Sequence, residues 1–356
     1  MPRPGMVTLP FARPVSASSR SRVSSVGKVP TLDIFAGAGG LSIGLEQAGF
    51  EIVAGAEWDR DACETFAKAH PAADVIEGNV NAIDFRRWRG KVEVVVGGPP
   101  CQPWSSGGKR LGVDDPRDGW PAFLHALREI RPRAFVAENV AGFAAGVRKA
   151  HFEALVAELR ALRFRVATQV LNAADYGVPQ RRWRMLIVGV RGGDFAFPAP
   201  RFGPGRDRPW REAGEVIGPE PVGVANPSIV TYARCPDIRP NPYDGHVYNG
   251  GGRPIDLSRP APTLLASMGG NKTPWVDTVG IVPRYHAHLA SGGAPRAGRV
   301  PGARRITVDE AALLQTFPPG MHFAGARSSC YRQIGNAVPP LLAQEVGAAL
   351  VELLRR

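Results

Sequence analysis

One cysteine, Cys101, has surroundings that could support covalent chemistry. It follows an apolar stretch, residues 92–96, and the segment Gly97-Gly98-Pro99-Pro100, which has the character of a rigid strand exit. A thiolate is a strong nucleophile, and a polar, glycine-rich setting favours its formation. A lone cysteine is more often an inert buried residue, but this setting favours a nucleophile.

Acidic and basic residues that could assist a nucleophile occur at the ends of two other apolar stretches. Glu138-Asn139-Val140 follows residues 134–137, and a carboxyl at such a strand end can act as an acid or hold a proton on a ring nitrogen. Arg182 and Arg184 precede residues 185–190, and alternation along a strand puts both on one face. Two guanidinium groups there suit a phosphate or a base carbonyl. Taken singly, Glu138-Asn139 could be a helix N-cap pair, and the two arginines could be surface charge.

A nucleoside site is indicated near the start of the chain. Residues 33–40, Asp-Ile-Phe-Ala-Gly-Ala-Gly-Gly, read as a strand followed by a glycine turn and a helix, although the third glycine of a dinucleotide fingerprint is missing. Glu57-Trp58 follows the next strand, where a carboxylate can bind ribose hydroxyls and an aromatic ring can stack on a purine. Asn336, beside a glycine and before the last helix, offers both a donor and an acceptor, with a helix entry turn as the alternative.

These residues are spaced by alternating strand and helix patterns, which predict an α/β fold with a mostly parallel sheet and helices on both faces. Ligands of such sheets bind beyond the carboxyl ends of the strands, where the residues above fall. Strands are expected at residues 31–35, 51–56, 92–96, 134–137, 165–171 and 185–190. Helices are expected at residues 59–68, 120–130, 152–162, 308–315 and 341–354. Residues 193–303 lack the alternation and predict a loop-rich second domain with short strands at 229–232 and 263–266.

Composition limits the classes of function. The chain has 356 residues and a formal charge of +12, and residues 1–30 carry five basic and no acidic residues. Residues 1–29 are therefore expected to be a disordered basic tail. The excess charge fits a nucleic-acid partner or simple solubility, and charge alone does not separate the two. The sequence has no apolar run of about 18 residues, so no membrane span is expected. An apolar signal segment is not seen either, so secretion is not expected. Four scattered cysteines favour a cytoplasmic protein without disulfides or a metal site.

The motifs in this order resemble the DNA (cytosine-5) methyltransferase family. The matching pieces are residues 33–40, 57–58, 100–102, 138–140, 180–184, 304–318 and 333–338, within about three fifths of the chain. The resemblance implies a catalytic domain of the S-adenosylmethionine-dependent (Rossmann-like) type, residues 31–192 plus 331–356. It also implies a target-recognition domain with a hinge, residues 193–330, across a cleft for duplex DNA. The partner restriction endonuclease would act functionally but without physical contact, and the enzyme would be a monomer.

The resemblance also implies roles for individual residues. Cys101 would attack C6 of a flipped-out cytosine, Glu138 would hold a proton at N3, Arg184 would pair with O2, and Arg182 would support Glu138 or nearby backbone. S-adenosylmethionine, without any metal, would be held by Phe35, Gly37, Gly39, Gly40, Glu57, Trp58, Asn79, Val80, Pro100, Asn336 and Val338.

Contacts with DNA are expected from a closing loop and from the recognition domain. The candidates are Ser105, Lys109, Arg110, Thr263, Asn271 and Lys272, with Arg234, Arg239 and Arg253 as possible phosphate ligands. Two departures from the family pattern are Asn79 in the adenine-contacting turn and a loop with Gly107 and Gly108, which have no side chain to fill the space of a flipped base.

Three other functions stay open from sequence. A tRNA cytosine-5 methyltransferase shares these motifs, but the 110-residue segment before residue 304 argues for DNA. A catalytically silent DNA-binding homologue is opposed by the intact Cys101, Glu138 and Arg184. A nicotinamide dehydrogenase fits least, because the glycine pattern is incomplete.

Overall fold

The computed structural model describes residues 27–100, 118–249 and 252–356 of the chain. Four residues expected to act at the site, Cys101, Ser105, Lys109 and Arg110, lie outside the described residues.

The described residues form one seven-stranded sheet in the order β3-β2-β1-β4-β5-β7-β6. Its strands are β1 Val29–Ile34, β2 Phe50–Glu57, β3 Asp74–Glu77, β4 Val94–Gly97, β5 Ala134–Val140, β6 Arg165–Asn172 and β7 Trp183–Val190. Only β7 among these runs antiparallel to its neighbours, β5 and β6. The expected parallel-dominated α/β fold is therefore confirmed, and the carboxyl ends of six strands meet the start of β7 at one edge.

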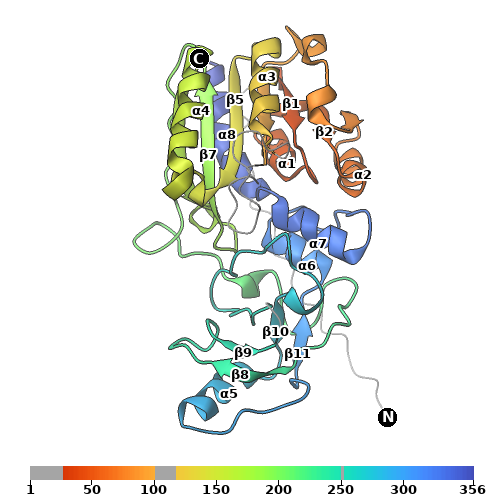
Figure 1. Ribbon diagram of the computed structural model, residues 1–356, viewed down its shortest axis with the longest axis vertical. Coiled ribbons are helices and arrows are strands. Elements are labelled where there is room, and N and C mark those ends of the chain that lie inside the picture. Colours follow the sequence, from red (N-terminus) through yellow and green to blue (C-terminus); the bar gives the residue numbers. More distant parts are fainter. Residues whose placement is uncertain (1–26, 101–117, 250–251) are drawn as a thin grey trace, which may run out of the picture.

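Helices cover both faces of this sheet (Figure 1). Helices α1 Gly40–Gln47 and α8 Pro340–Leu354 pack together on one face, so the C-terminal end of the chain completes the N-terminal fold. The opposite face buries α3 Trp120–Ile130 and α4 Lys149–Ala161, and α2 Arg60–Ala69 flanks β2 and β3. The apolar faces of these helices bury residues such as Leu45, Phe123 and Leu350 completely, which makes the sheet a rigid support for its edge.

A second, loop-rich part lies on the carboxyl-end side of the sheet (Figure 1). It contains the two-stranded sheets β8 Tyr232–Asp237 with β9 His246–Tyr248 and β10 Trp275–Asp277 with β11 Ala303–Arg305, and helix α5 Ile281–Ala290. Helices α6 Val308–Leu314 and α7 Arg327–Asn336 lie between the two parts in Figure 1. Their apolar cluster includes Ala38 and Ile43 from the glycine turn and α1, so the two parts share a core.

Several expected boundaries need correction. Strand β1 begins at Val29, which is buried, so the expected tail 1–29 includes the first residue of the sheet. Residue 331, the expected start of the last catalytic-domain segment, lies inside α7. Residues 263–266 form no strand. The short strand expected at 229–232 is instead β8, which begins at Tyr232.

One apolar stretch, Arg327–Leu354, is long enough to cross a membrane by length and composition. It comprises α7 and α8, and more than half of its most apolar window is buried inside the protein. Because α8 packs against α1 in the core, burial within this fold explains the apolar character of the stretch.

Candidate active site

The strand ends that carry the candidate residues lie in register. Ile34 at the end of β1 pairs with Gly97 at the end of β4, and Gly97 pairs with Ala137 of β5. The next residues along these strands, Phe35, Gly98 and Glu138, therefore lie at the same level, although β5 itself continues to Val140. The register thus brings the glycine turn, the segment leading to Cys101 and the candidate acid to one edge.

Glu138 and Arg184 form an ion pair across β5 and β7. Nε of Arg184 lies 2.6 Å from Oε1 of Glu138, and the two side chains are only 13% and 11% exposed. Arg184 pairs with Val140 in the sheet, two residues beyond Glu138, which puts both side chains on the same face. Nη1 of Arg184 donates to the carbonyl of Trp183, and the described residues supply no partner for Nη2. The pair thus fixes the carboxylate and leaves one guanidinium nitrogen for a ligand.

The segment before Cys101 is fixed by two hydrogen bonds. Nδ2 of Asn139 donates to the carbonyl of Pro99 at 3.0 Å, and the amide of Gly119 donates to the carbonyl of Pro100 at 2.9 Å. A Cβ on Gly119 would lie 2.5 Å from Pro100 and 2.9 Å from Phe35, so only glycine fits there. Pro100 and Gly119, on either side of residues 101–117, are thus in direct contact, close to Glu138.

Arg182 is fully buried, unlike a surface charge. Nη1 donates to the carbonyl of Leu264 at 3.0 Å, and Nη2 donates to the carbonyls of Gly335 and Ala337 at 2.7 and 2.8 Å. Burial, and secondarily the charge of Arg184, lowers its pKa to about 9. Of the two expected roles, contact with Glu138 or with backbone, the structure places Arg182 on backbone carbonyls from the recognition part and α7.

Glu57 organises the glycine turn. Its carboxylate accepts hydrogen bonds from the amides of Gly37, Trp58 and Asp59, each at 2.9 Å. Gly37 has φ of 55°, in the left-handed region that favours glycine, and Phe35 also has a positive φ of 63°. A non-glycine residue in this region is strained, and such strain is frequent at ligand sites. Glu57 therefore fixes the conformation of the glycine turn, in which Phe35 and Gly37 stay partly exposed.

The remaining cofactor candidates differ in how far their side chains are exposed to solvent. Trp58 is 81% exposed, so its ring is not part of the core and is open to a ligand. Val80 and Val338 are buried, whereas Asn79 and Asn336 are exposed. Oδ1 of Asn79 accepts from the amide of Asn81, which caps a short 3₁₀ turn.

Gly40 joins the two ends of the sequence. A Cβ on Gly40 would lie 2.5 Å from the carbonyl of Val338 and 3.1 Å from Ala337. No side chain fits between these segments, so the start of α1 lies directly against the end of α7. Asn336 is the last residue of α7, so it ends one helix, whereas the alternative to a ligand role was a turn entering the next helix.

Asp33 was not singled out from the sequence, yet it is the most perturbed acid of the site. Its carboxyl is 1% exposed, accepts from Oγ of Ser42 at 2.6 Å through Oδ2, and has no partner for Oδ1 among the described residues. Burial raises its pKa to about 7. An acidic residue inside the otherwise apolar strand before a glycine turn was the available signal.

Two glutamines, Gln180 and Gln315, lie in the matching pieces of the sequence, but no role was predicted for them. Gln180 accepts from the amide of Leu264 at 3.0 Å and donates to Gln315, whose own amide donates to the carbonyl of Ile334. Both glutamines are fully buried. Together with Arg182, they tie the segment before β7 to the recognition part, to the end of α6 and to α7.

The candidate DNA ligands of the recognition part fall into two groups. Oγ1 of Thr263 donates to the carbonyl of Arg181 at 2.6 Å, so this hydroxyl holds the two parts together. Asn271 and Lys272 lie exposed on a short 3₁₀ turn, Gly270–Lys272. Asn271 also accepts from the amide of Gly252 through its carbonyl. The structure therefore brings Thr263 to Arg181, just before β7, and leaves Asn271 and Lys272 at the surface.

Comparison with known sequences agrees with this arrangement. The family model for C-5 cytosine-specific DNA methylase matches residues 29–207 and 268–352. The type II methyltransferase M.NgoPII of Neisseria gonorrhoeae is 32% identical over 336 residues, covering 91% of this chain and 96% of that protein. M.Eco47II of Escherichia coli is 34% identical, with coverage of 91% and 79%, and M.PspPI of Psychrobacter is 33% identical, also with coverage of 91% and 79%.

Solved structures show the same fold. A putative DNA modification methyltransferase encoded in an E. coli prophage aligns with a TM-score of 0.66 at 20% identity, covering 92% of this chain and all of that chain. Dnmt2 of Schizosaccharomyces pombe aligns with a TM-score of 0.67 at 14% identity and the same coverage. The expected methyltransferase fold and the expected family are confirmed, and the chain belongs to the C-5 cytosine-specific DNA methylase family.

Proposed function

We propose that the edge of the sheet around Glu138 and Arg184 methylates C5 of a flipped-out cytosine in duplex DNA. Family membership makes cytosine-5 methylation of DNA the activity of this chain. The single observation that carries the residue assignment is the Glu138–Arg184 ion pair, 2.6 Å long, beside the fixed segment that leads to Cys101. The target base must leave the duplex, because C5 and C6 are otherwise inaccessible within the stack.

The residues around the glycine turn fit S-adenosylmethionine. Its adenine suits the exposed face of Trp58, and its ribose hydroxyls suit the acceptor oxygens of Glu57. Its positive charge suits Asp33, whose Oδ1 is buried without a partner among the described residues. Phe35, Gly37, Gly39, Gly40, Asn79, Val80, Pro100, Asn336 and Val338 would complete the site. When bound, the cofactor supplies an electrophilic methyl group.

The chain's own residues would then activate the cytosine. The thiolate of Cys101 would add to C6, and the displaced electron pair would make C5 nucleophilic. Glu138, oriented by Arg184, would hold a proton at N3 and so offset the negative charge that builds in the ring. Nη2 of Arg184 would donate to O2 of the cytosine. After methylation, a base acting through water would take the C5 proton, and the electron pair left at C5 would re-form the ring double bond and expel the Cys101 thiolate.

We further propose that the chain is the modification partner of a restriction endonuclease, acting in the cytoplasm as a monomer and without contact with that endonuclease. The relatives carry names of type II methyltransferases. The recognition part, residues 193–330, would select the DNA sequence, with Thr263, Asn271 and Lys272 near the duplex. Ser105, Lys109 and Arg110 would also contact the DNA.

Bisulfite sequencing of DNA from a host that expresses the chain tests this function. We expect one short sequence to become fully protected from conversion, and no protection with Cys101→Ala. Protection without sequence preference, or protection that survives Cys101→Ala, would contradict the proposal.

A further inference from the structure

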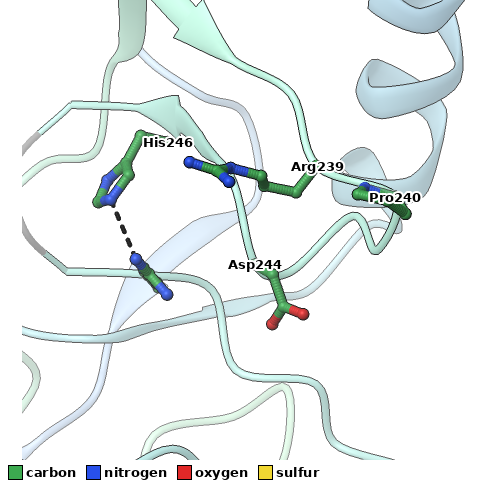
Figure 2. A pocket seen from close by; sticks show the side chains of 5 residues that line it. Arg239, Pro240, Asp244 and His246 are labelled. Carbon is green, nitrogen blue, oxygen red and sulfur yellow. Dashed lines mark hydrogen bonds between the residues drawn. The ribbon is translucent and has the colours of Figure 1, made fainter.

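A pocket of about 410 Å³ opens on the recognition part, and its lining includes Arg239 and Arg253, which the sequence offered as phosphate ligands. It is lined by Arg239, Pro240, Asp244, His246 and Arg253. Figure 2 shows Arg239, Asp244 and His246 around the hollow. Its dashed line marks the hydrogen bond between Arg253 and the imidazole of His246. Strand β9 and the connection from β8 supply four of these residues, and Arg253 comes from the segment that follows β9.

Arg253 is held firmly although its side chain is exposed. Its carbonyl accepts from the amide of Trp275, which is fully buried, and the amide of its neighbour Gly252 donates to the carbonyl of Asn271. Its Nη2 lies 3.0 Å from Nε2 of His246. A guanidinium only donates, so Nε2 must accept and the imidazole carries its proton on Nδ1. This contact uses one nitrogen and is the only hydrogen bond of the guanidinium among the described residues.

The charges of the pocket are balanced. Nε and Nη2 of Arg239 both donate to Oδ2 of Asp237, at 3.0 and 2.9 Å. The carboxylate of Asp244 is exposed and has no hydrogen-bond partner among the described residues. The lining holds two arginines and one aspartate, and one of the arginines is already paired with Asp237, so the pocket has little excess positive charge for a phosphate. Exposed donors beside an exposed acceptor suit the edge of a base pair, which presents both.

The pocket is also fixed with respect to the candidate active site. The segment from Arg253 continues to Leu264, whose amide and carbonyl bond to Gln180 and Arg182. Arg182 directly precedes β7, which carries Arg184, and Gln180 lies three residues before that strand. A base pair read in the pocket would therefore stand at a set distance from the cytosine at Glu138.

We propose that Arg253 reads a guanine in the major groove of the target sequence and that Asp244 accepts a hydrogen bond from the amino group of the paired cytosine. A guanidinium fork donating to O6 and N7 is the commonest specific contact to guanine, and a carboxylate accepts from N4 of cytosine. Arg239, held by Asp237, closes the side of the pocket. This inference rests on the proposed function, because it requires duplex DNA as the substrate.

Methylation rates on the target and on duplexes with each single base pair replaced test the proposal. We expect Arg253→Gln to lower the preference for one G·C pair by about 5- to 150-fold, and Asp244→Asn to weaken the preference at the same position. Arg253→Lys keeps the charge but not the fork, so most of the preference should still be lost. Arg284→Gln, an exposed arginine of α5 whose guanidinium donates to backbone carbonyls, is the matched control.

The salt dependence of DNA binding separates the alternatives. A base contact leaves the slope of log K against log salt unchanged in Arg253→Gln, whereas a phosphate contact lowers it by about 0.9 at unchanged sequence preference. The second result, or no change in slope or preference, would overturn the proposal. If the unaltered protein and Arg284→Gln methylate no DNA, the proposed function itself fails, which is a different outcome.

Discussion

Nε of Arg184 and Oε1 of Glu138 lie 2.6 Å apart at the edge of the sheet, in an ion pair almost closed to solvent. The pair joins the last strand of the parallel series to the antiparallel β7, so its geometry depends on the register between these two strands. A carboxylate held in this way has one orientation before any ligand arrives. That pre-orientation is what proton transfer to a bound base requires.

Replacing the carboxylate should therefore affect catalysis more than binding. We expect Glu138→Gln to lower kcat by about 10²- to 10⁴-fold, the usual contribution of a positioned acid or base, and to change the Kd for DNA little. Single-turnover methyl transfer and a binding titration measure the two effects. Glu51→Gln, an exposed carboxylate on β2, should behave like the unaltered protein. A weaker Kd for DNA with unchanged kcat would show that Glu138 serves binding only.

Trp58 should stabilise the bound cofactor through its exposed ring. We expect Trp58→Ala to weaken the binding of S-adenosylhomocysteine by about 5- to 150-fold, the range for losing one aromatic–base stack. Trp183→Ala removes another exposed tryptophan, 52% exposed at the start of β7, and should leave this affinity unchanged. Calorimetric titration measures both, and similar Kd values for the two variants would remove Trp58 from the site.

Arg182 should contribute to stability. Its removal leaves the carbonyls of Leu264, Gly335 and Ala337 buried without a donor, and each unsatisfied group costs about 1 to 3 kcal/mol. We expect Arg182→Met to lower the free energy of unfolding by roughly 3 kcal/mol, and Arg182→Lys by less. Urea unfolding beside the exposed control Arg181→Met measures the difference. Equal unfolding midpoints for both methionine variants would contradict this role.

Asp33 should make stability depend on pH. Its pKa is raised by burial from 3.8 to about 7, so between these values the folded protein holds a proton that the unfolded chain has lost. The free energy of unfolding should thus fall as the pH rises through this window and stay level above it. Asp33→Asn should remove this slope and stabilise the cofactor-free protein at pH 8 by about 1 to 3 kcal/mol. An unchanged slope in this variant would contradict the assignment.

The sheet and most helices could be predicted because their signals are local. Residues 120–130 coincide with α3, and apolar runs marked each central strand to within a few residues. Helix α5 was missed because Pro283 and two histidines break its apolar pattern. Helix α7 was missed because the inward-facing Ser329 and Gln333 are polar.

The site was predictable where chemistry sits at strand ends and unpredictable where it depends on distant pairing. Glu138 and Arg184 could be named because each stands at the end of an apolar run. Residues 263–266 have a strand-like pattern, but Thr263 and Leu264 bond to Arg181, Gln180 and Arg182 and form no strand. Nothing local in the sequence states that these segments meet.

The central claim is that this chain methylates C5 of cytosine in DNA through Cys101. The most direct measurement is nucleoside analysis of duplex DNA after incubation with radiolabelled S-adenosylmethionine. We predict that all label appears in 5-methylcytosine with the unaltered protein and that none appears with Cys101→Ala. Label in N4-methylcytosine, in 6-methyladenine or only in RNA, or undiminished label with Cys101→Ala, would contradict the account.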